Sequence, residues 1–126
     1  MLTEEQISFI CDDLVHPLHF LWFAIGSEYG VSASQDDPES FQKRRKDFLD
    51  LLGRLLREGK LRLAKNDVFL AGSVEEQAAK FEASFPESDA GIDLGGAGTW
   101  FFTDACPGGA VWVTKGPSGE EILEWT

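Results

Sequence analysis

The sequence predicts an α+β fold with about four helices packed on an antiparallel sheet, an early hairpin and a C-terminal β-meander. Three observations predict it. Apolar residues recur every three or four positions in the first part of the chain, they alternate in short runs after residue 60, and Gly, Pro, Asn and Asp separate the runs. Because most helical patterns precede the strand patterns, we expect the helices to cover one face of the sheet. The 126 residues make a single domain, 1–126.

Two helices are expected near the N-terminus. Thr3 and Gln6 form a capping box, and apolar residues at positions 7, 10, 11 and 14 share one side of a helix that runs to about Val15. Pro17 ends that helix and opens a second one over 17–28. The second helix is apolar nearly all round, as expected of a helix that is packed on several sides.

The middle of the chain contains the most regular helical pattern. Residues 39–58 repeat apolar positions over nearly five turns, and Gly59 ends the helix. Residues 60–65 then alternate, and Asn66 and Asp67 turn the chain into a second short strand at 68–70. Ser73 and Glu76 form another capping box, which opens a helix that Pro86 stops.

The last third is rich in glycine and aromatic residues. Residues 87–98 have no period and are expected to form a mobile acidic loop, followed by strands at 99–103, 110–114 and 120–125. Neighbouring strand residues face opposite sides of a sheet, so these strands put aromatic side chains on both faces. We expect the Phe side chains to be core and Trp125, near the chain end, to be partly exposed.

The net charge of −11 is unevenly distributed. Residues 1–42 contain eight acidic and no basic residues, and residues 66–126 contain eleven acidic and two basic ones. Residues 43–65 contain nine of the eleven basic residues and three acidic ones, so this segment is at +6. A strongly negative protein repels phosphate backbones and attracts basic partners, so nucleic acid is disfavoured as a partner.

The basic segment nevertheless supports an alternative. A helix followed by a two-stranded hairpin, from Phe41 to Leu70, has the outline of a winged-helix recognition unit. The nucleic-acid-binding residues would then be Lys43, Lys46, Arg54, Arg57, Lys60, Arg62 and Lys65. Against this, Asp47, Asp50 and Glu58 share the polar side of the helix, so the basic side chains are expected to be neutralised by their neighbours. Docking of the segment on acidic surface of this chain or of a second copy, as a homodimer, is a third interpretation.

The sequence gives little sign of catalysis. Its two cysteines and two histidines have no zinc-site spacing, and no nucleotide-binding or metalloprotease motif is present. Cys106, in a Pro-Gly-Gly turn, would need His16 or His19 brought close by the fold to act as a nucleophile. We therefore expect no enzyme activity, no catalytic residue, no metal site and no cofactor. The apolar run at 18–25 is too short to cross a membrane, and a cytoplasmic location is expected.

Four sequence blocks point to a family. The runs REGKLRLAKN (57–66), FLAGSVEEQ (69–77), FP (85–86) and WFFTDACPGGAVWV (100–113) resemble a small bacterial family known as domain of unknown function 596. The resemblance spans about residues 45–126. It implies a compact cytoplasmic α+β protein, and it supplies no catalytic residue. In size and charge the chain also resembles the immunity proteins of bacterial toxin systems.

The charge map leads to a functional hypothesis. We expect a non-enzymatic protein-binding module whose acidic surface docks a basic partner, such as a toxin domain that it inhibits as an immunity protein does. The expected contact residues are Asp36, Asp37, Glu87, Asp89, Asp93, Asp104 and Trp125.

Overall fold

The elements of the fold follow the predicted order with two exceptions near the C-terminus. The computed structural model describes the chain apart from residues 1, 12–15, 34 and 95. The helices are α1 (Glu4–Cys11), α2 (Leu18–Glu28), α3 (Pro38–Arg57), α4 (Val74–Ser84), α5 (Asp89–Asp93) and the 3-10 helix η1 (Thr99–Phe102). The strands are β1 (Leu61–Lys65), β2 (Val68–Phe69), β3 (Gly109–Lys115) and β4 (Glu121–Trp125). The α+β class is confirmed, and the expected end of the first helix near Val15 lies outside the described residues.

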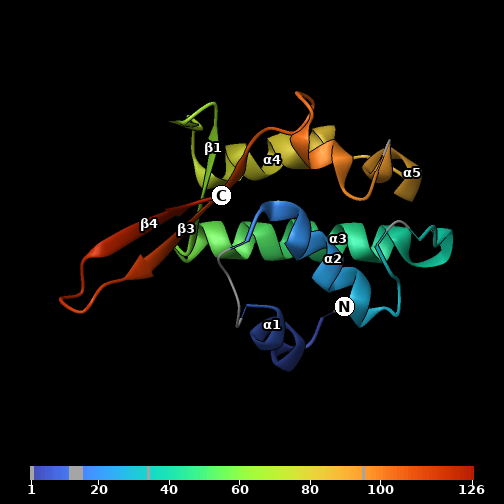
Figure 1. Cartoon of the computed structure of the whole chain (residues 1–126), viewed down its shortest axis with the longest axis horizontal. Helices are drawn as coiled ribbons and strands as arrows, with labels where there is room; N and C mark the ends of the chain where they lie inside the picture. Colours follow the sequence, from blue (N-terminus) through green and yellow to red (C-terminus); the bar gives the residue numbers. More distant parts are fainter. Residues whose placement is uncertain (1, 12–15, 34, 95) are drawn as a thin grey trace.

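Helix α3 is the centre of the helical part. It runs the length of this part, with α4 alongside it and α2 crossing it (Figure 1). Its apolar stripe is buried, with Phe48 and Leu52 fully inaccessible to solvent. Both predicted capping boxes are present: Gln6 and Thr3 exchange hydrogen bonds at the start of α1, and Glu76 and Ser73 do so at the start of α4. These caps satisfy amide groups that a helix start leaves unpaired.

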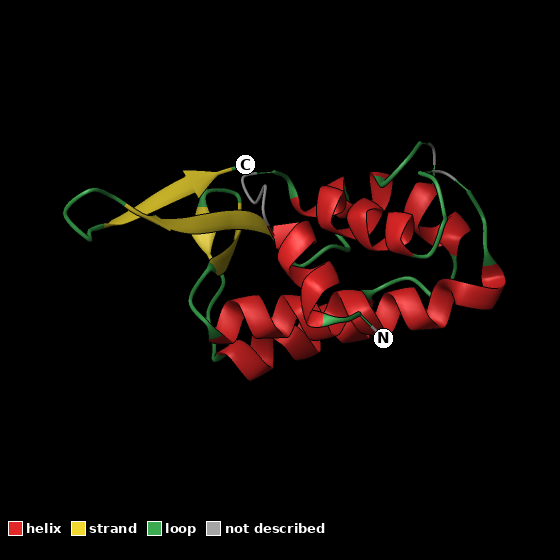
Figure 2. Cartoon of the chain, turned by 90° about the horizontal axis from the view of Figure 1, so that it is seen from below, coloured by secondary structure: helices red, strands yellow, loops and turns green. Residues whose placement is uncertain are grey.

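The four strands form one antiparallel sheet in the order β2-β1-β3-β4. The predicted turn between β1 and β2 is confirmed, with Asn66 and Asp67 at φ angles of 54° and 65°. Positive φ at two successive residues is the type I′ geometry that joins two strands with a two-residue loop. The sheet stands beside the C-terminal end of α3, and the β3–β4 hairpin extends beyond the helices (Figure 2).

The two faces of the sheet have different surroundings. Leu61, Leu63 and Trp112 lie on the helix side and are buried. On the other face, Trp125 contacts Phe69 with ring centroids 5.2 Å apart. Trp125 is 49% exposed, which agrees with the partial exposure predicted for it. Aromatic side chains therefore lie on both faces of the sheet, with Trp112 buried on the helix side and Trp125 partly exposed on the other.

Two predicted elements are wrong. Residues 99–103, predicted as a strand, contain η1, in which Trp100 and Phe101 are both buried. Two adjacent aromatic side chains cannot enter one core from a strand, because a strand turns them to opposite faces. Residues 87–98, predicted as a mobile loop, contain the short helix α5, whose start is capped by the Ser88 hydroxyl accepting from the Gly91 amide.

The expectation that the Phe side chains of the C-terminal strands are core holds for Phe101, which is buried, but not for Phe102. Phe102 is 69% exposed and Phe20 is 46% exposed. Both contact the imidazole of His19, at centroid distances of 4.9 Å and 4.6 Å. Desolvation by burial lowers the pKa of His19, so the neutral ring is favoured in this aromatic cluster.

Candidate acidic binding site

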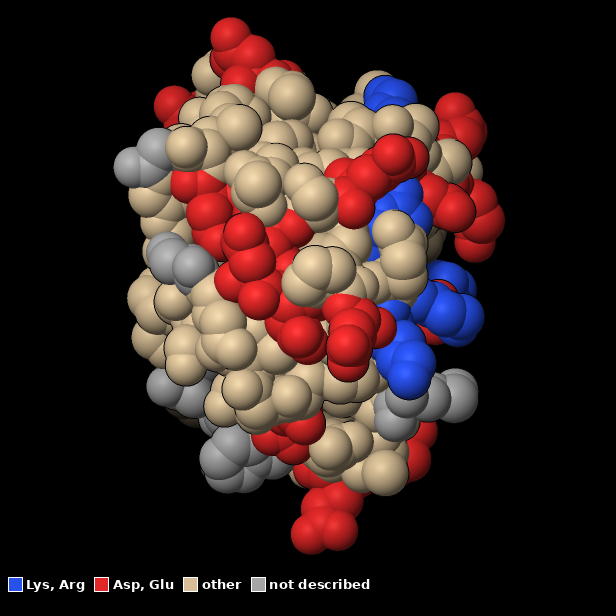
Figure 3. All heavy atoms as spheres, turned by 90° about the vertical axis from the view of Figure 1, so that its right-hand side faces the viewer, with Lys and Arg blue, Asp and Glu red and all other residues tan. Residues whose placement is uncertain are grey.

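A small acidic cleft lies between the N-terminal end of α3 and the start of α5. Its volume is about 150 Å³. The buried ring of Phe41 contributes an apolar floor, and the exposed carboxylates of Asp36 and Glu87 lie at its rim. Its lining consists of Asp36, Pro38, Phe41, Gln42, Glu87, Ser88, Asp89 and Ala90. At this end of the molecule, Asp and Glu side chains form a broad band across the surface, with Lys and Arg confined to one edge (Figure 3).

A buried ion pair beneath the cleft joins its two sides. The guanidinium of Arg44 donates two hydrogen bonds to the Asp89 carboxylate, of 2.7 Å and 2.8 Å. Arg44 also donates to the Asp37 carbonyl at 2.9 Å and to the Ser40 hydroxyl at 2.8 Å. Asp89 in turn accepts the Asp37 amide at 2.8 Å. These bonds connect the segment before α3 to α5, so they fix the position of the cleft walls.

The surroundings of Arg44 keep this ion pair out of solvent. Arg44 is 1% exposed and Asp89 is 6% exposed. The guanidinium lies over the rings of Trp22 and Phe41, at 5.3 Å and 5.5 Å from their centroids. Burial opposes ionisation of Asp89, but the hydrogen bonds from Arg44 and from the Asp37 amide outweigh it and lower the pKa of Asp89. Asp89 is therefore a charged structural residue.

The structure brings only some of the predicted contact residues together. Asp36 and Glu87 both line the cleft, and both are exposed. Asp37 is half-buried, and its carboxylate accepts a hydrogen bond from the Ser40 hydroxyl. Asp89 is not at the surface, contrary to its predicted role in docking, because Arg44 holds it inside. Of the residues predicted for docking, Asp36 and Glu87 are the two that line the cleft and are exposed.

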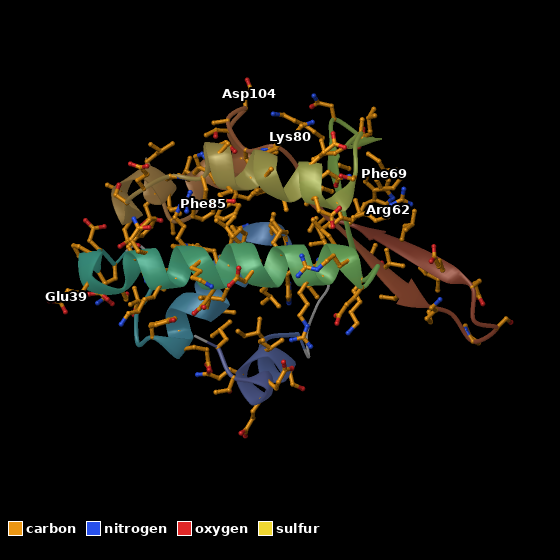
Figure 4. All side chains as sticks on the ribbon, turned by 180° about the vertical axis from the view of Figure 1, so that it is seen from behind. Glu39, Arg62, Phe69, Lys80, Phe85 and Asp104 are labelled. Atoms are coloured by element: carbon orange, nitrogen blue, oxygen red, sulfur yellow. The ribbon has the colours of Figure 1, made fainter. Side chains whose placement is uncertain are left out.

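The other predicted contact residues lie elsewhere. Asp93 is half-buried and accepts the Gly98 amide at 3.0 Å. Asp104 is exposed, but it lies on the α4 side of the molecule, far from Glu39 at the start of α3 (Figure 4). Trp125 is on the sheet with Phe69. The seven residues therefore do not form one surface.

Most of the basic residues proposed for nucleic-acid contact have partners within the chain. Lys46 pairs with Asp50 at 2.7 Å, Arg54 with Glu4 at 3.0 Å and with Glu58 at 3.3 Å, and Lys60 with Glu58 at 3.4 Å. The Arg62 guanidinium lies 3.8 Å from the Phe69 ring centroid, and Lys65 donates to the carbonyls of Asp104 and Cys106. The hydrogen bonds that the Arg54 guanidinium donates to Glu4 and Glu58 raise the pKa of Arg54.

Asp47, two of the basic residues and the packing of α3 differ from the expectations for the basic segment. Asp47, expected on the polar side of α3 near Lys43, is buried and accepts a hydrogen bond from the Tyr29 hydroxyl. Lys43 and Arg57 have no ion-pair partner among the residues that the structure describes. Helix α3 is packed between other helices, which is unlike a recognition helix that must enter a groove of DNA.

Cys106 is placed where its thiol is protected. It is buried, and its Sγ donates to the Gly108 carbonyl at 3.4 Å. Desolvation by burial raises the pKa of Cys106 to about 11. The imidazole of His19 contacts the rings of Phe20, Phe23 and Phe102. These contacts give no support to a pair of His19 with Cys106.

A reactivity measurement checks this protection. We expect alkylation of Cys106 by iodoacetamide at pH 7.5 to be at least about 100-fold slower than that of an exposed cysteine, since a thiol with a pKa near 11 supplies very little thiolate. Mass spectrometry of peptides over time would measure the rate, and the urea-unfolded chain provides the matched fast control. Rapid alkylation of Cys106 in the native protein would contradict the conclusion that its thiol is buried and protected.

Neither a metal site nor a membrane span emerges from the described residues. Within residues 2–11, 16–33, 35–94 and 96–126, no group of three or more His, Cys, Asp or Glu side chains is placed to hold a metal ion. In the same part of the chain, no helix combines the length and apolar character needed to cross a bilayer.

Comparison with known proteins places the chain in a family. Residues 56–126 match the family described as "Protein of unknown function, DUF596". A solved structure from Neisseria meningitidis, described as an uncharacterized protein conserved in bacteria, is similar with a TM-score of 0.64 and 29% identity. The similarity covers 94% of this chain and 84% of that one. No curated protein gives a significant match. Because the family match covers more than half of its residues, the chain belongs to the DUF596 family of proteins of unknown function.

Proposed function

We propose that the chain is a non-enzymatic protein-binding module that docks a basic partner at the acidic cleft between α3 and α5. One observation carries the proposal. The carboxylates of Asp36 and Glu87 are exposed at a cleft whose walls are fixed from beneath by Arg44 and Asp89. Electrostatic complementarity of this kind speeds encounter and selects partners of opposite charge.

The size and chemistry of the cleft suit a cationic side chain. Its volume of about 150 Å³ is well below the roughly 300–1,000 Å³ of typical small-molecule sites. A Lys or Arg side chain has an apolar stem and a charged end. The stem would lie against Phe41, and the charge would lie between Asp36 and Glu87. A loop of a basic protein is therefore a better occupant than a cofactor.

The partner class follows from the charge of the whole molecule. At −11, the chain attracts basic proteins over distances beyond direct contact and repels nucleic acid. A basic toxin domain has this chemistry, and masking its cationic surface would inhibit it in the manner of an immunity protein. A cytoplasmic location of the complex is part of this proposal.

A pair of charge-reversal variants tests the cleft. Asp36→Lys/Glu87→Lys is expected to weaken binding of the basic partner by at least about tenfold, because it places two cations where the partner's own cations dock. The partner would be isolated from host lysate on the immobilised chain, identified, purified and measured by calorimetry at low and high salt. Binding should also weaken as salt rises.

The matched control is Glu5→Lys/Glu75→Lys, which changes the net charge by the same amount at exposed positions on α1 and α4. This control should bind within about threefold of the unchanged chain, because a distant charge is screened by salt. Equal loss in both variants would mean that total charge alone drives the association. A salt-sensitive partner that proves to be DNA or RNA would contradict the proposed function.

A further inference from the structure

The outer edge of β4 has a row of backbone groups directed away from the sheet. The β3–β4 register pairs Val113 with Leu123, and the Val113 amide donates to the Lys60 carbonyl next to β1. In an antiparallel ladder, opposed residues alternate between hydrogen-bonded and non-hydrogen-bonded pairs. Val113 and Leu123 are thus a non-hydrogen-bonded pair, and the amide and carbonyl of Leu123 point away from β3. Glu121 and Trp125 are each two residues from Leu123, so their amides and carbonyls also point away from β3.

No strand among the described residues covers this edge. β4 is the terminal strand in the sheet order, and its hairpin extends beyond the helices (Figure 2). None of its five residues is buried, and Ile122 and Trp125 are 39% and 49% exposed. An exposed edge with apolar side chains is a template for pairing with another strand. Its amides at 121, 123 and 125 offer three successive pairing positions on one side.

The charges of β4 select the kind of strand that pairs with it. The strand carries Glu121 and Glu124 and no basic residue. Antiparallel pairing of two copies about Leu123 would bring the two Glu124 side chains diagonally near each other, in chains that each carry −11. A strand with Lys or Arg opposite Glu121 and Glu124 and an aliphatic residue opposite Leu123 instead makes favourable cross-strand pairs.

We propose that β4 binds an extended basic segment of a partner protein, which joins the sheet as an added antiparallel strand. Main-chain hydrogen bonds supply affinity in this mode, and alternate side chains supply specificity. The hairpin and the acidic cleft lie at opposite ends of the molecule (Figure 1). The proposal depends on the backbone and charges of β4 and not on the cleft, so each of the two binding proposals can be tested without the other.

A synthetic peptide probes the edge directly. Acetyl-Gly-Thr-Lys-Val-Thr-Lys-Gly-amide places its two lysines opposite Glu124 and Glu121 and its valine opposite Leu123. We expect amide signals at 121, 123 and 125 of the full chain to shift on titration and their hydrogen exchange to slow by about tenfold near saturation. A Kd of roughly 0.1–1 mM is expected for so short a segment. The peptide with glutamates in place of both lysines should bind at least about tenfold more weakly.

Two changes to the backbone test the pairing itself. Leu123→Pro removes the residue 123 amide donor at the outer edge and leaves the β3–β4 hydrogen bonds in place, so it should weaken peptide binding about five- to tenfold. Leu123→Ala keeps this amide and should bind the peptide more tightly than the proline variant does. N-methylation of the peptide valine makes the same test on the unchanged protein, should either variant fail to fold. Equal binding of the N-methylated peptide, equal binding of the acidic peptide, or absence of shifts at millimolar peptide would overturn the proposal. Concentration-dependent self-association that protects the same amides would identify a second copy as the occupant and overturn it too.

Discussion

Replacement of Arg44 by methionine is expected to lower the free energy of unfolding by about 3–5 kcal/mol, since it leaves the Asp89 carboxylate buried without its cation. The variant also loses the hydrogen bonds to the Asp37 carbonyl, just before α3, and to the Ser40 hydroxyl in the first turn of α3. Urea unfolding monitored by circular dichroism measures the loss. The same variant should weaken binding at the cleft, because the wall that carries Asp36 is no longer fixed.

Two comparisons separate charge burial from packing. Arg44→Met/Asp89→Leu removes both charges, and it should recover at least about half of the stability that the single change loses. If the double variant is as unstable as the single one, packing around the Arg44 stem is the main contribution.

The same ion pair predicts a pH dependence. The pKa of Asp89 is lowered in the folded chain, so its contribution to stability is present above the unfolded pKa of about 4 and is lost as the pH falls through the folded value. Acid unfolding followed from pH 6 to pH 2 should show this loss. Arg44→Met removes the main cause of the lowered pKa and leaves only the Asp37 amide opposing desolvation, so that part of the acid sensitivity should disappear or reverse in sign.

Replacement of Phe48 by alanine is expected to cost about 3–5 kcal/mol, the range for deleting a fully buried ring. Phe48 contacts the rings of Phe85 at 5.2 Å, Phe101 at 5.6 Å and Trp22 at 6.0 Å, so its removal leaves a cavity where α2, α3 and η1 meet. Phe85 points into the space between α3 and α4 (Figure 4), which places the cavity at the centre of the helical part.

The exposed Phe102 provides the matched control. Phe102→Ala removes the same number of atoms from a side chain that is 69% exposed, and it should change the free energy of unfolding by less than about 1 kcal/mol. Thermal and urea unfolding of the two variants, side by side, measure the difference. Similar losses in both would mean that the Phe102 and His19 cluster is part of the core.

Local patterns predicted most of the elements because they act through near neighbours. The period of α3, the capping boxes at Thr3 and Ser73 and the turn at Asn66 need only residues within a few positions of each other. The strand prediction at 99–103 is wrong because it relied on the aromatic residues of this segment, which are common in strands. Gly98, at φ 72°, starts a tight turn of helix there instead.

The residues of the candidate site are only partly predictable from the sequence. Asp36 and Glu87 are identified by charge alone, but the burial of Asp89 depends on Arg44, which is 45 residues away in sequence. A local signal for this existed: Arg44 lies between Phe41 and Phe48 on the apolar stripe of α3, where a charged residue is costly unless it is paired. The identity of its partner required the fold, because acidic residues are abundant in this chain and no pattern selects one of them.

The 20 residues of α3 separate the acidic cleft from the sheet. At a rise of about 1.5 Å per residue, the helix sets a spacing of about 30 Å between the two ends. A small globular domain is about as wide as this spacing, so a single domain that contacted both ends would have to lie along the whole length of α3. If both proposed sites bind separate partners, α3 holds those partners about 30 Å apart.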